Sequence, residues 1–288
     1  MNQFKFLGFA SFLITTDTGL NILIDPYIDD NPKAPLKTDD LPKIDLILVS
    51  HGAFDHMKDT PKIAKRDGSK IICGGETMNL LIDQGVPKEQ ITNSVWGLTV
   101  EECGIRVRPV VSMHRSSVRL SDGTAMDGFA LGFIIYLPDG TRVYNASDTA
   151  LFSDMKLIGE LHKPHVGLMN VTIENCFDFL PEFLTGEMTP YEAALACQWL
   201  NLDYAVACHY ADKDNQDVRE FEQMLNDAGQ KRRRSAKACC FESGRNFRIF
   251  CKIGKLSRKR RCGYDEIGIY RPWDYGKAHG KKPAEGRL

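Results

Sequence analysis

The chain has 288 residues, of which 43% are hydrophobic and 26% charged, a composition typical of a globular protein. It contains no run of about 18 apolar residues, which excludes a membrane-spanning helix, and its first residues are interpreted as a strand rather than a signal peptide. Nine cysteines without a repeating framework favour a reducing compartment, so we expect a cytoplasmic protein.

The first quarter of the chain is typical of strands joined by short turns. The segments FKFLGF, SFLITTDTG and NILIDPY are apolar or alternating and are separated by Gly, Asp and Pro. The continuous apolar run IDLILVS, residues 44–50, predicts a strand buried on both faces. The polar stretch VSHGAFDHMKD, residues 49–59, follows it directly and is interpreted as a loop.

Strands and helices are then predicted to alternate. Residues 70–74, 95–112, 128–147, 165–171 and 204–210 are typical of strands. Helices are predicted at 60–68 with Thr60 as cap, at 76–85, at 153–163 with Ser153 as cap, and at 216–229 ending at Gly229. Another helix starts at Thr189, with Pro190 at its first position and Glu192 at its third. This order predicts an α/β protein with two sheets packed face to face and helices outside.

Residues 170–187 form a long connection between a predicted strand and a helix, and such loops are uncommon unless they are functional. Its aromatic residues Phe177, Phe179 and Phe183 give it an apolar side. A lid over a pocket and a plug of local core are both open interpretations.

Six polar side chains occur at or close to the ends of predicted apolar strands, where ligand sites of layered α/β proteins commonly lie. Imidazole with carboxylate is the ligand set of Zn²⁺ and similar divalent ions. The sequence therefore predicts a metal site, whereas His162, His165 and His279 lack this context. The candidate ligands are His51, Asp55, His56, His114, Asp148 and His209.

Five segments in order resemble the metallo-β-lactamase superfamily, whose loop pattern is H-x-H-x-D-H. They are LGFASFLI with NILIDPY, LVSHGAFDHMKDTPKIAK, SMHRSS, ASDTALFSDMKLIGELHKP, and MTPYEAALACQWL with AVACHY. The chain most resembles the small hydrolases that include the ascorbate-6-phosphate lactonases. The resemblance covers about residues 4–250 and implies a four-layer αββα fold. We expect a hydrolase domain at 1–254 and a basic extension at 255–288.

The resemblance implies two adjoining metal sites. One would use His51, residue 53, His114 and the shared Asp148, but residue 53 is Ala, which cannot coordinate an ion. The other, Asp55, His56, His209 and Asp148, is complete. We therefore expect one tightly bound Zn²⁺, Mn²⁺ or Fe²⁺ at the complete set. Asp55, His51 and His114 are the candidate catalytic residues, as partners of the attacking water or as acid and base.

The expected function is metal-dependent hydrolysis of a small anionic lactone or ester-like substrate. A phosphodiesterase or nuclease is the enzyme alternative, and a metal-binding regulatory protein is the non-enzyme alternative. Arg115, with Ser116 and Ser117, could meet an anionic substrate group, although a surface salt bridge is the favoured interpretation of Arg115. The sequence leaves homo-oligomerisation open.

The charge of −1 hides a strong asymmetry, because residues 231–288 hold 18 Lys or Arg against 5 Asp or Glu. The basic runs at 231–234 and 258–261 resemble nucleic-acid patches, but a solvated extension is favoured over a nucleic-acid partner. Cys239, Cys240, Cys251 and Cys262 lack the paired C-x2-C spacing of a zinc site and predict none.

Overall fold

The structure is a computed structural model that describes residues 1–171, 186–231, 236–241 and 243–248. Residues 1–251 form one compact unit, and the predicted extension 255–288 lies outside the described residues. The described strands form two seven-stranded sheets. In spatial order the first sheet contains β14 (Asn246–Arg248), β1 (Gln3–Gly8), β2 (Ser11–Thr15), β3 (Asn21–Ile24), β4 (Leu46–Leu48), β5 (Lys70–Cys73) and β6 (Ile91–Asn93).

The second sheet repeats this plan. Each sheet pairs antiparallel on one side and parallel on the other, with the change at β3 in the first sheet and at β10 in the second. The strands of the second sheet are, in spatial order, β13 (Lys237–Cys239), β12 (Tyr204–Cys208), β11 (Val166–Asn170), β10 (Arg142–Asn145), β9 (Ala125–Tyr136), β8 (Ile105–Arg119) and β7 (Val100–Glu102).

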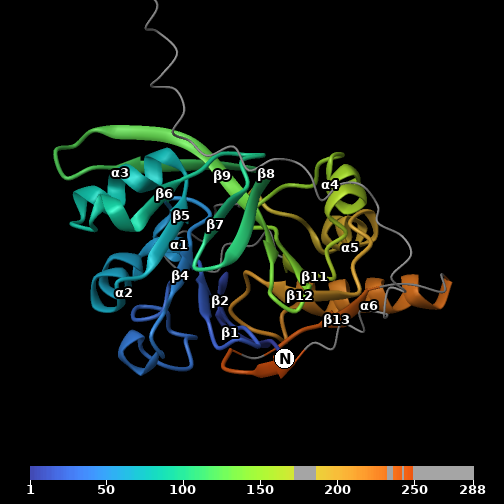
Figure 1. Cartoon of the computed structure of the whole chain (residues 1–288). Coiled ribbons are helices and arrows are strands. Elements are labelled where there is room, and N and C mark those ends of the chain that lie inside the picture. Colours follow the sequence, from blue (N-terminus) through green and yellow to red (C-terminus); the bar gives the residue numbers. More distant parts are fainter. Residues whose placement is uncertain (172–185, 232–235, 242, 249–288) are drawn as a thin grey trace, which may run out of the picture. The chain divides into compact units, whose positions relative to one another are not determined.

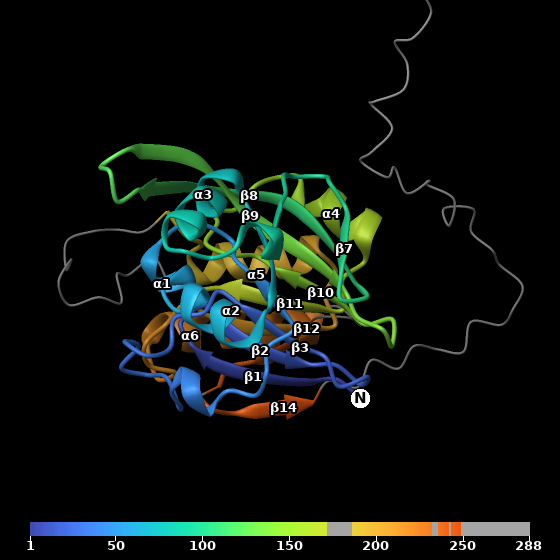
Figure 2. The same cartoon turned by 60° about the vertical axis from the view of Figure 1, so that its left-hand side comes forward.

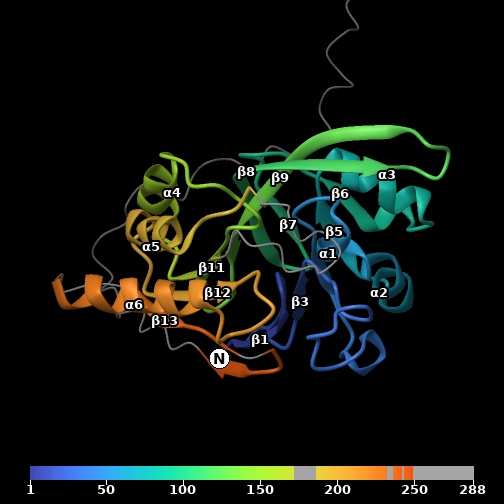
Figure 3. The same cartoon turned by 180° about the vertical axis from the view of Figure 1, so that it is seen from behind.

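Helices cover the outer face of each sheet, as Figures 1 and 3 show. The predicted four-layer αββα fold is therefore confirmed. Beside the first sheet lie α1 (Phe54–Met57), α2 (Thr60–Asp67) and α3 (Gly75–Asp83), with the short 3-10 turns η1 (Thr38–Asp40) and η2 (Lys88–Gln90). Beside the second lie α4 (Met155–His162), α5 (Pro190–Trp199) and α6 (Gln216–Lys231).

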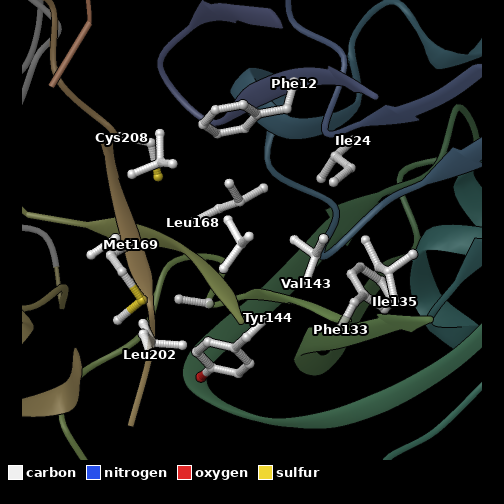
Figure 4. Packing of buried hydrophobic residues seen from close by; sticks show 14 of the residues in the cluster. Phe12, Ile24, Phe133, Ile135, Val143, Tyr144, Leu168, Met169, Leu202 and Cys208 are labelled. Atoms are coloured by element: carbon white, nitrogen blue, oxygen red, sulfur yellow. The ribbon is translucent and has the colours of Figure 1, made fainter. Parts of the chain in front are cut away.

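Two clusters of buried side chains hold these layers together. One lies between the sheets and extends beneath α4, α5 and α6, and the other lies between the first sheet and α2 and α3. Figure 4 shows Phe12 and Ile24 of the first sheet across from Leu168 and Val143 of the second. Leu13, next to Phe12, belongs to the other cluster, because successive side chains of a strand point to opposite faces.

Local signals located most helices correctly, with shifts of one or two residues at their ends. The predicted Thr189–Glu192 capping box is present at the start of α5. The N-cap residue of α2 is Asp59 rather than Thr60, and that of α4 is Asp154 rather than Ser153, with no side-chain capping hydrogen bond at either. Helix α6 continues to Lys231 instead of ending at Gly229. These shifts do not move a ligand candidate.

Two predictions near the candidate ligands were wrong. The stretch interpreted as a loop contains the one-turn helix α1, which carries two of the candidates. The strand-rich segment predicted at 95–112 is too short, because β8 continues to Arg119 and pairs with β9 in a hairpin that projects past α3 (Figure 2). Within the described residues, no helix is long and apolar enough to cross a membrane.

Candidate metal centre

Ends of strands from both sheets bring the ligand candidates together. The chain leaves β4, reaches His51 and turns into α1, which carries Asp55 and His56. Asp148 follows β10, and His209 comes directly after β12. The carboxyl ends of parallel strands lie on the same side of a sheet, so these residues meet although they are far apart in sequence.

His114 is positioned differently, because it lies within a strand and not after the end of one. It lies inside β8, where the register with β9 is interrupted between Val111 and Arg115. Such an irregularity re-aims a side chain that regular alternation would place elsewhere. The prediction that His114 marks a strand end was therefore wrong, although its side chain does reach the site.

Four candidates form what we call the complete cluster, namely Asp55, His56, Asp148 and His209, all buried. His56 Nε2 lies 3.0 Å from Asp148 Oδ2 and 3.5 Å from Asp55 Oδ2, and His209 Nε2 lies 3.4 and 3.5 Å from the same two oxygens. Ligand atoms about 2.1 Å from a tetrahedral ion lie roughly 3.4 Å apart. The spacing of the four side chains therefore fits a single small divalent ion.

His51, His114 and Asp148 form a second group, which we call the incomplete cluster. His51 Nε2 lies 3.8 Å from Asp148 Oδ2, and the His51 and His114 rings are 5.2 Å apart. Ala53 is the residue before α1 and its backbone is extended. The H-x-H-x-D-H pattern of the resemblance places a further ligand at this position, and Ala has no donor atom.

The donor atoms fit a cation better than they fit one another. His51 Nε2, His56 Nε2 and Asp148 Oδ1 are buried, and none of them forms a hydrogen bond to a described residue. Leaving such atoms unpaired costs about 1–3 kcal/mol each. Imidazole nitrogens and carboxylate oxygens converging on a common point are the ligand chemistry of Zn²⁺, Mn²⁺ and Fe²⁺, so the residues present fit a bound divalent ion.

Carboxylates favour the protonated form of both imidazoles in the complete cluster. Burial alone would lower the pKa of His56, but Asp148 and Asp55 raise it well above its usual value. Burial likewise opposes protonation of His209, yet Asp148 and Glu187 raise its pKa. A divalent ion would bring the same total charge to this place as the two imidazolium ions. Because an imidazole must be neutral to coordinate a cation, ion binding is expected to release protons.

We expect the thermal stability of the chelator-treated protein to depend on pH in a defined direction. The raised pKa values mean that the His56 and His209 imidazolium ions stabilise the fold fully below the ordinary histidine pKa of about 6.5. That stabilisation is lost as the pH rises through the raised values. Differential scanning fluorimetry should show Tm falling above about pH 6.5 without metal, and a smaller change with Zn²⁺ present. A Tm of the stripped protein that climbs over this range would contradict the assignment.

His51 differs from the other two buried imidazoles. Burial, with His56 close by, lowers the pKa of His51 to about 3. His51 is therefore neutral at pH 7, and Ser50 Oγ lies 3.0 Å from its Nδ1. Its Nε2 faces Asp148 of both clusters.

Two further carboxylates support the cluster, and the search for ligands in the sequence missed both. Asp25 Oδ2 lies 3.0 Å from His56 Nδ1 and accepts the hydroxyl hydrogen of Ser50 at 2.8 Å. Glu187 Oε2 lies 3.0 Å from His209 Nδ1. Asp25 follows the apolar run NILI, which is the signal that selected the histidines and could have found it. Glu187 has no comparable signal.

Left-handed backbone turns recur where the chain leaves a strand for the site. Asp25, Ser147 and His209 have φ of 45°, 59° and 62°. Phe9 has φ 50°, and its carbonyl accepts the backbone N–H of His209 at 2.7 Å. This conformation costs a non-glycine residue roughly 1–2 kcal/mol. Strain of this kind concentrates at functional sites.

Replacing Ser147 by glycine is expected to stabilise the protein. Ser147→Gly removes the left-handed strain and a buried hydroxyl that bonds to no described residue. Against this gain, glycine costs about 0.5–1 kcal/mol of chain entropy. A net gain of about 1 kcal/mol would raise Tm by roughly 2–4 °C in a calorimeter. The neighbouring Ala146→Gly is the control and should lower Tm, and an equal drop in both variants would contradict the strain argument.

The remaining candidates lie elsewhere or outside the described residues. Arg115 is 73% exposed and pairs with Asp127 at 2.8 Å, as the salt-bridge interpretation expected. Tyr136 Oη lies 2.9 Å from His162 Nδ1, and His165 contacts Arg142. Of the predicted lid or plug, residues 172–185 lie outside the description, as do His279, Cys251, Cys262 and the basic extension.

Known proteins share this fold and much of this sequence. A family model described as a β-lactamase superfamily domain matches residues 20–210. A UPF0173 metal-dependent hydrolase of Rubrobacter xylanophilus is 36% identical over 209 residues, covering 72% of this chain and 81% of its own. One from Methanosarcina mazei is 36% identical over 225 residues, with 77% and 90% covered.

A solved structure is also similar. Igni18, a metallo hydrolase from the archaeon Ignicoccus hospitalis, is 27% identical and has a TM-score of 0.66. The match covers 86% of this chain and 99% of that one.

Proposed function

The chain belongs to the UPF0173 metal-dependent hydrolases of the metallo-β-lactamase superfamily, and from this premise we propose that one divalent ion at the complete cluster carries the reaction. The protein is a metal-dependent hydrolase. The observation that supports the proposal is the convergence of four buried donor atoms at 3.0–3.5 Å, against three in the incomplete cluster. Ala53 leaves the incomplete cluster one ligand short.

In such a site a bound divalent ion supplies Lewis acidity and activates a water molecule near neutral pH. Asp55, His56, Asp148 and His209 would hold the ion. Asp55 is one of the two carboxylates at the cluster and is placed to accept a hydrogen bond from the attacking water. The carboxylates of Asp55 and Asp148 would thus bind the cation, and that of Asp55 would also orient the nucleophile.

The histidines of the incomplete cluster have separate proposed roles. His51 is neutral because its pKa is about 3, so it accepts a hydrogen bond without storing a proton. His114 is only partly buried, and we assign it the role of general acid toward the leaving group. With no fourth ligand at residue 53, neither imidazole is committed to a tightly held second ion.

We propose a small anionic lactone or ester-like compound as the substrate, on the strength of the resemblance to the lactonase group. Arg115 does not support recognition of the anionic part, because its guanidinium pairs with Asp127 on an exposed strand. The anionic group is therefore expected to meet the bound cation itself.

The test is a substrate panel of lactones, carboxylic esters and phosphodiesters with the chelator-stripped protein. Zn²⁺, Mn²⁺ or Fe²⁺ is added separately, and turnover is followed for each pair. Hydrolysis of a lactone or ester that stops on chelation supports the proposal. Cleavage of phosphodiesters alone would replace it with the phosphodiesterase function, and tight ion binding without any turnover would favour the regulatory protein.

A further inference from the structure

Glu187 is a buried carboxylate beside the complete cluster that the proposed reaction does not use. Its side chain is 2% exposed, and it lies at the start of the segment that leads into α5. A buried carboxylate is costly unless a positive or hydrogen-bonding group compensates it. Its Oε2 lies 3.0 Å from His209 Nδ1, whose ring is 3% exposed. The two side chains form a buried ion pair.

The Glu187 carboxylate does not serve to cap helix α5. The capping box of α5 is made by Thr189 and Glu192: Glu192 Oε2 accepts the backbone N–H of Thr189 at 2.9 Å. Glu187 precedes that box, and its carboxylate is directed at His209 instead. The opposite ring nitrogen, His209 Nε2, faces Asp55 and Asp148. The imidazole thus lies between an outer carboxylate and the cluster.

The two clusters differ in the groups that contact the outer ring nitrogens of their histidines. In the complete cluster, both imidazoles have a buried carboxylate behind them, Asp25 for His56 and Glu187 for His209. In the incomplete cluster, His51 has the neutral hydroxyl of Ser50 behind it. Carboxylates that contact a ligating histidine orient its ring and raise its basicity, and their loss typically lowers metal affinity about 10–100-fold.

We propose that Glu187 is a positioning residue that holds His209 with Nε2 toward the cluster and so determines how tightly the complete cluster binds its ion. The proposal rests on the proposed function only in placing the ion there. Glu187 does not touch the ion or the substrate. It acts through His209, by fixing the ring orientation and by placing a negative charge behind the ligand.

The experiment compares Glu187→Gln with Glu192→Gln in the chelator-stripped full-length chain. The Kd of Zn²⁺, and separately of Mn²⁺, is measured by competition with a chromophoric chelator. Glu187→Gln is expected to weaken binding about 10–100-fold. Glu192→Gln makes the same chemical change five residues away, and glutamine can still form the capping box of α5, so the Kd should stay unchanged. If a substrate is found, saturating metal should restore most of the Glu187→Gln activity.

Binding by Glu187→Gln within twofold of the wild type would overturn the proposal. An equal loss of affinity in both variants would also overturn it, because the effect would then come from α5 stability. The glutamine side chain keeps the volume of Glu187, and unfolding of this variant is checked by circular dichroism before titration. Because the measurement needs no substrate, a wild-type protein that binds metal but hydrolyses nothing would sink the proposed function without affecting this test.

Discussion

Replacing Asp148 by alanine is expected to abolish stoichiometric metal binding and to lower hydrolysis by at least about a hundredfold. Asp148 is the residue that the complete and incomplete clusters share. Its Oδ2 lies 3.0 Å from His56 Nε2, 3.4 Å from His209 Nε2 and 3.8 Å from His51 Nε2. Loss of a group behind a ligand already costs about 10–100-fold in affinity, so loss of a ligand that joins both clusters should cost more.

Metal content measured by elemental analysis after gel filtration tests this prediction. A second readout is thermal stability, because an ion at about 100 times its Kd stabilises the folded state by about 2.7 kcal/mol. That shift corresponds to roughly 5–10 °C in Tm for a protein of this size, and Asp148→Ala should not show it. Asp154→Ala, an exposed acidic position at the start of α4, is the matched control. An Asp148→Ala protein that keeps one tightly bound ion would exclude the assigned ligand set.

Replacing Ala53 by histidine is expected to raise the metal content from about one ion per chain toward two. Residue 53 lies two positions after His51 and directly before α1, where the H-x-H-x-D-H pattern has a ligand. An imidazole there would give the incomplete cluster a third nitrogen beside His51 and His114, with Asp148 as the shared carboxylate. Four ligands of this kind make a closed site for a divalent ion.

Ala53→Leu is the control for Ala53→His, since leucine adds bulk without a donor atom. Isothermal titration with Zn²⁺ or Mn²⁺ should show a second binding event in Ala53→His alone. A wild-type chain that already binds two ions would refute the role given to Ala53. A single event in Ala53→His would show instead that the backbone at residue 53 directs its side chain away from His51.

Membership in the metallo-β-lactamase superfamily and the αββα fold could be predicted from the sequence because their signals are local. The apolar run before His51 identifies a buried strand, and Thr189 with Glu192 identifies the start of α5. The same reasoning found the six histidine and aspartate candidates, which the structure brings into two adjoining clusters. Their assignment as ligands, and the predicted domain boundary at 254, stay predictions.

The sequence by itself determined the candidate ligand types, the strand ends that carry most of them and the presence of Ala at residue 53, because each depends on neighbouring residues. Only the tertiary structure decided which atoms face one another. His114 reaches the site through an interrupted register between β8 and β9, which depends on pairing across a hairpin. Asp25 and Glu187 support His56 and His209 across 31 and 22 residues of chain. Such pairings are set by the packing of two sheets, and local periodicity carries no information about them.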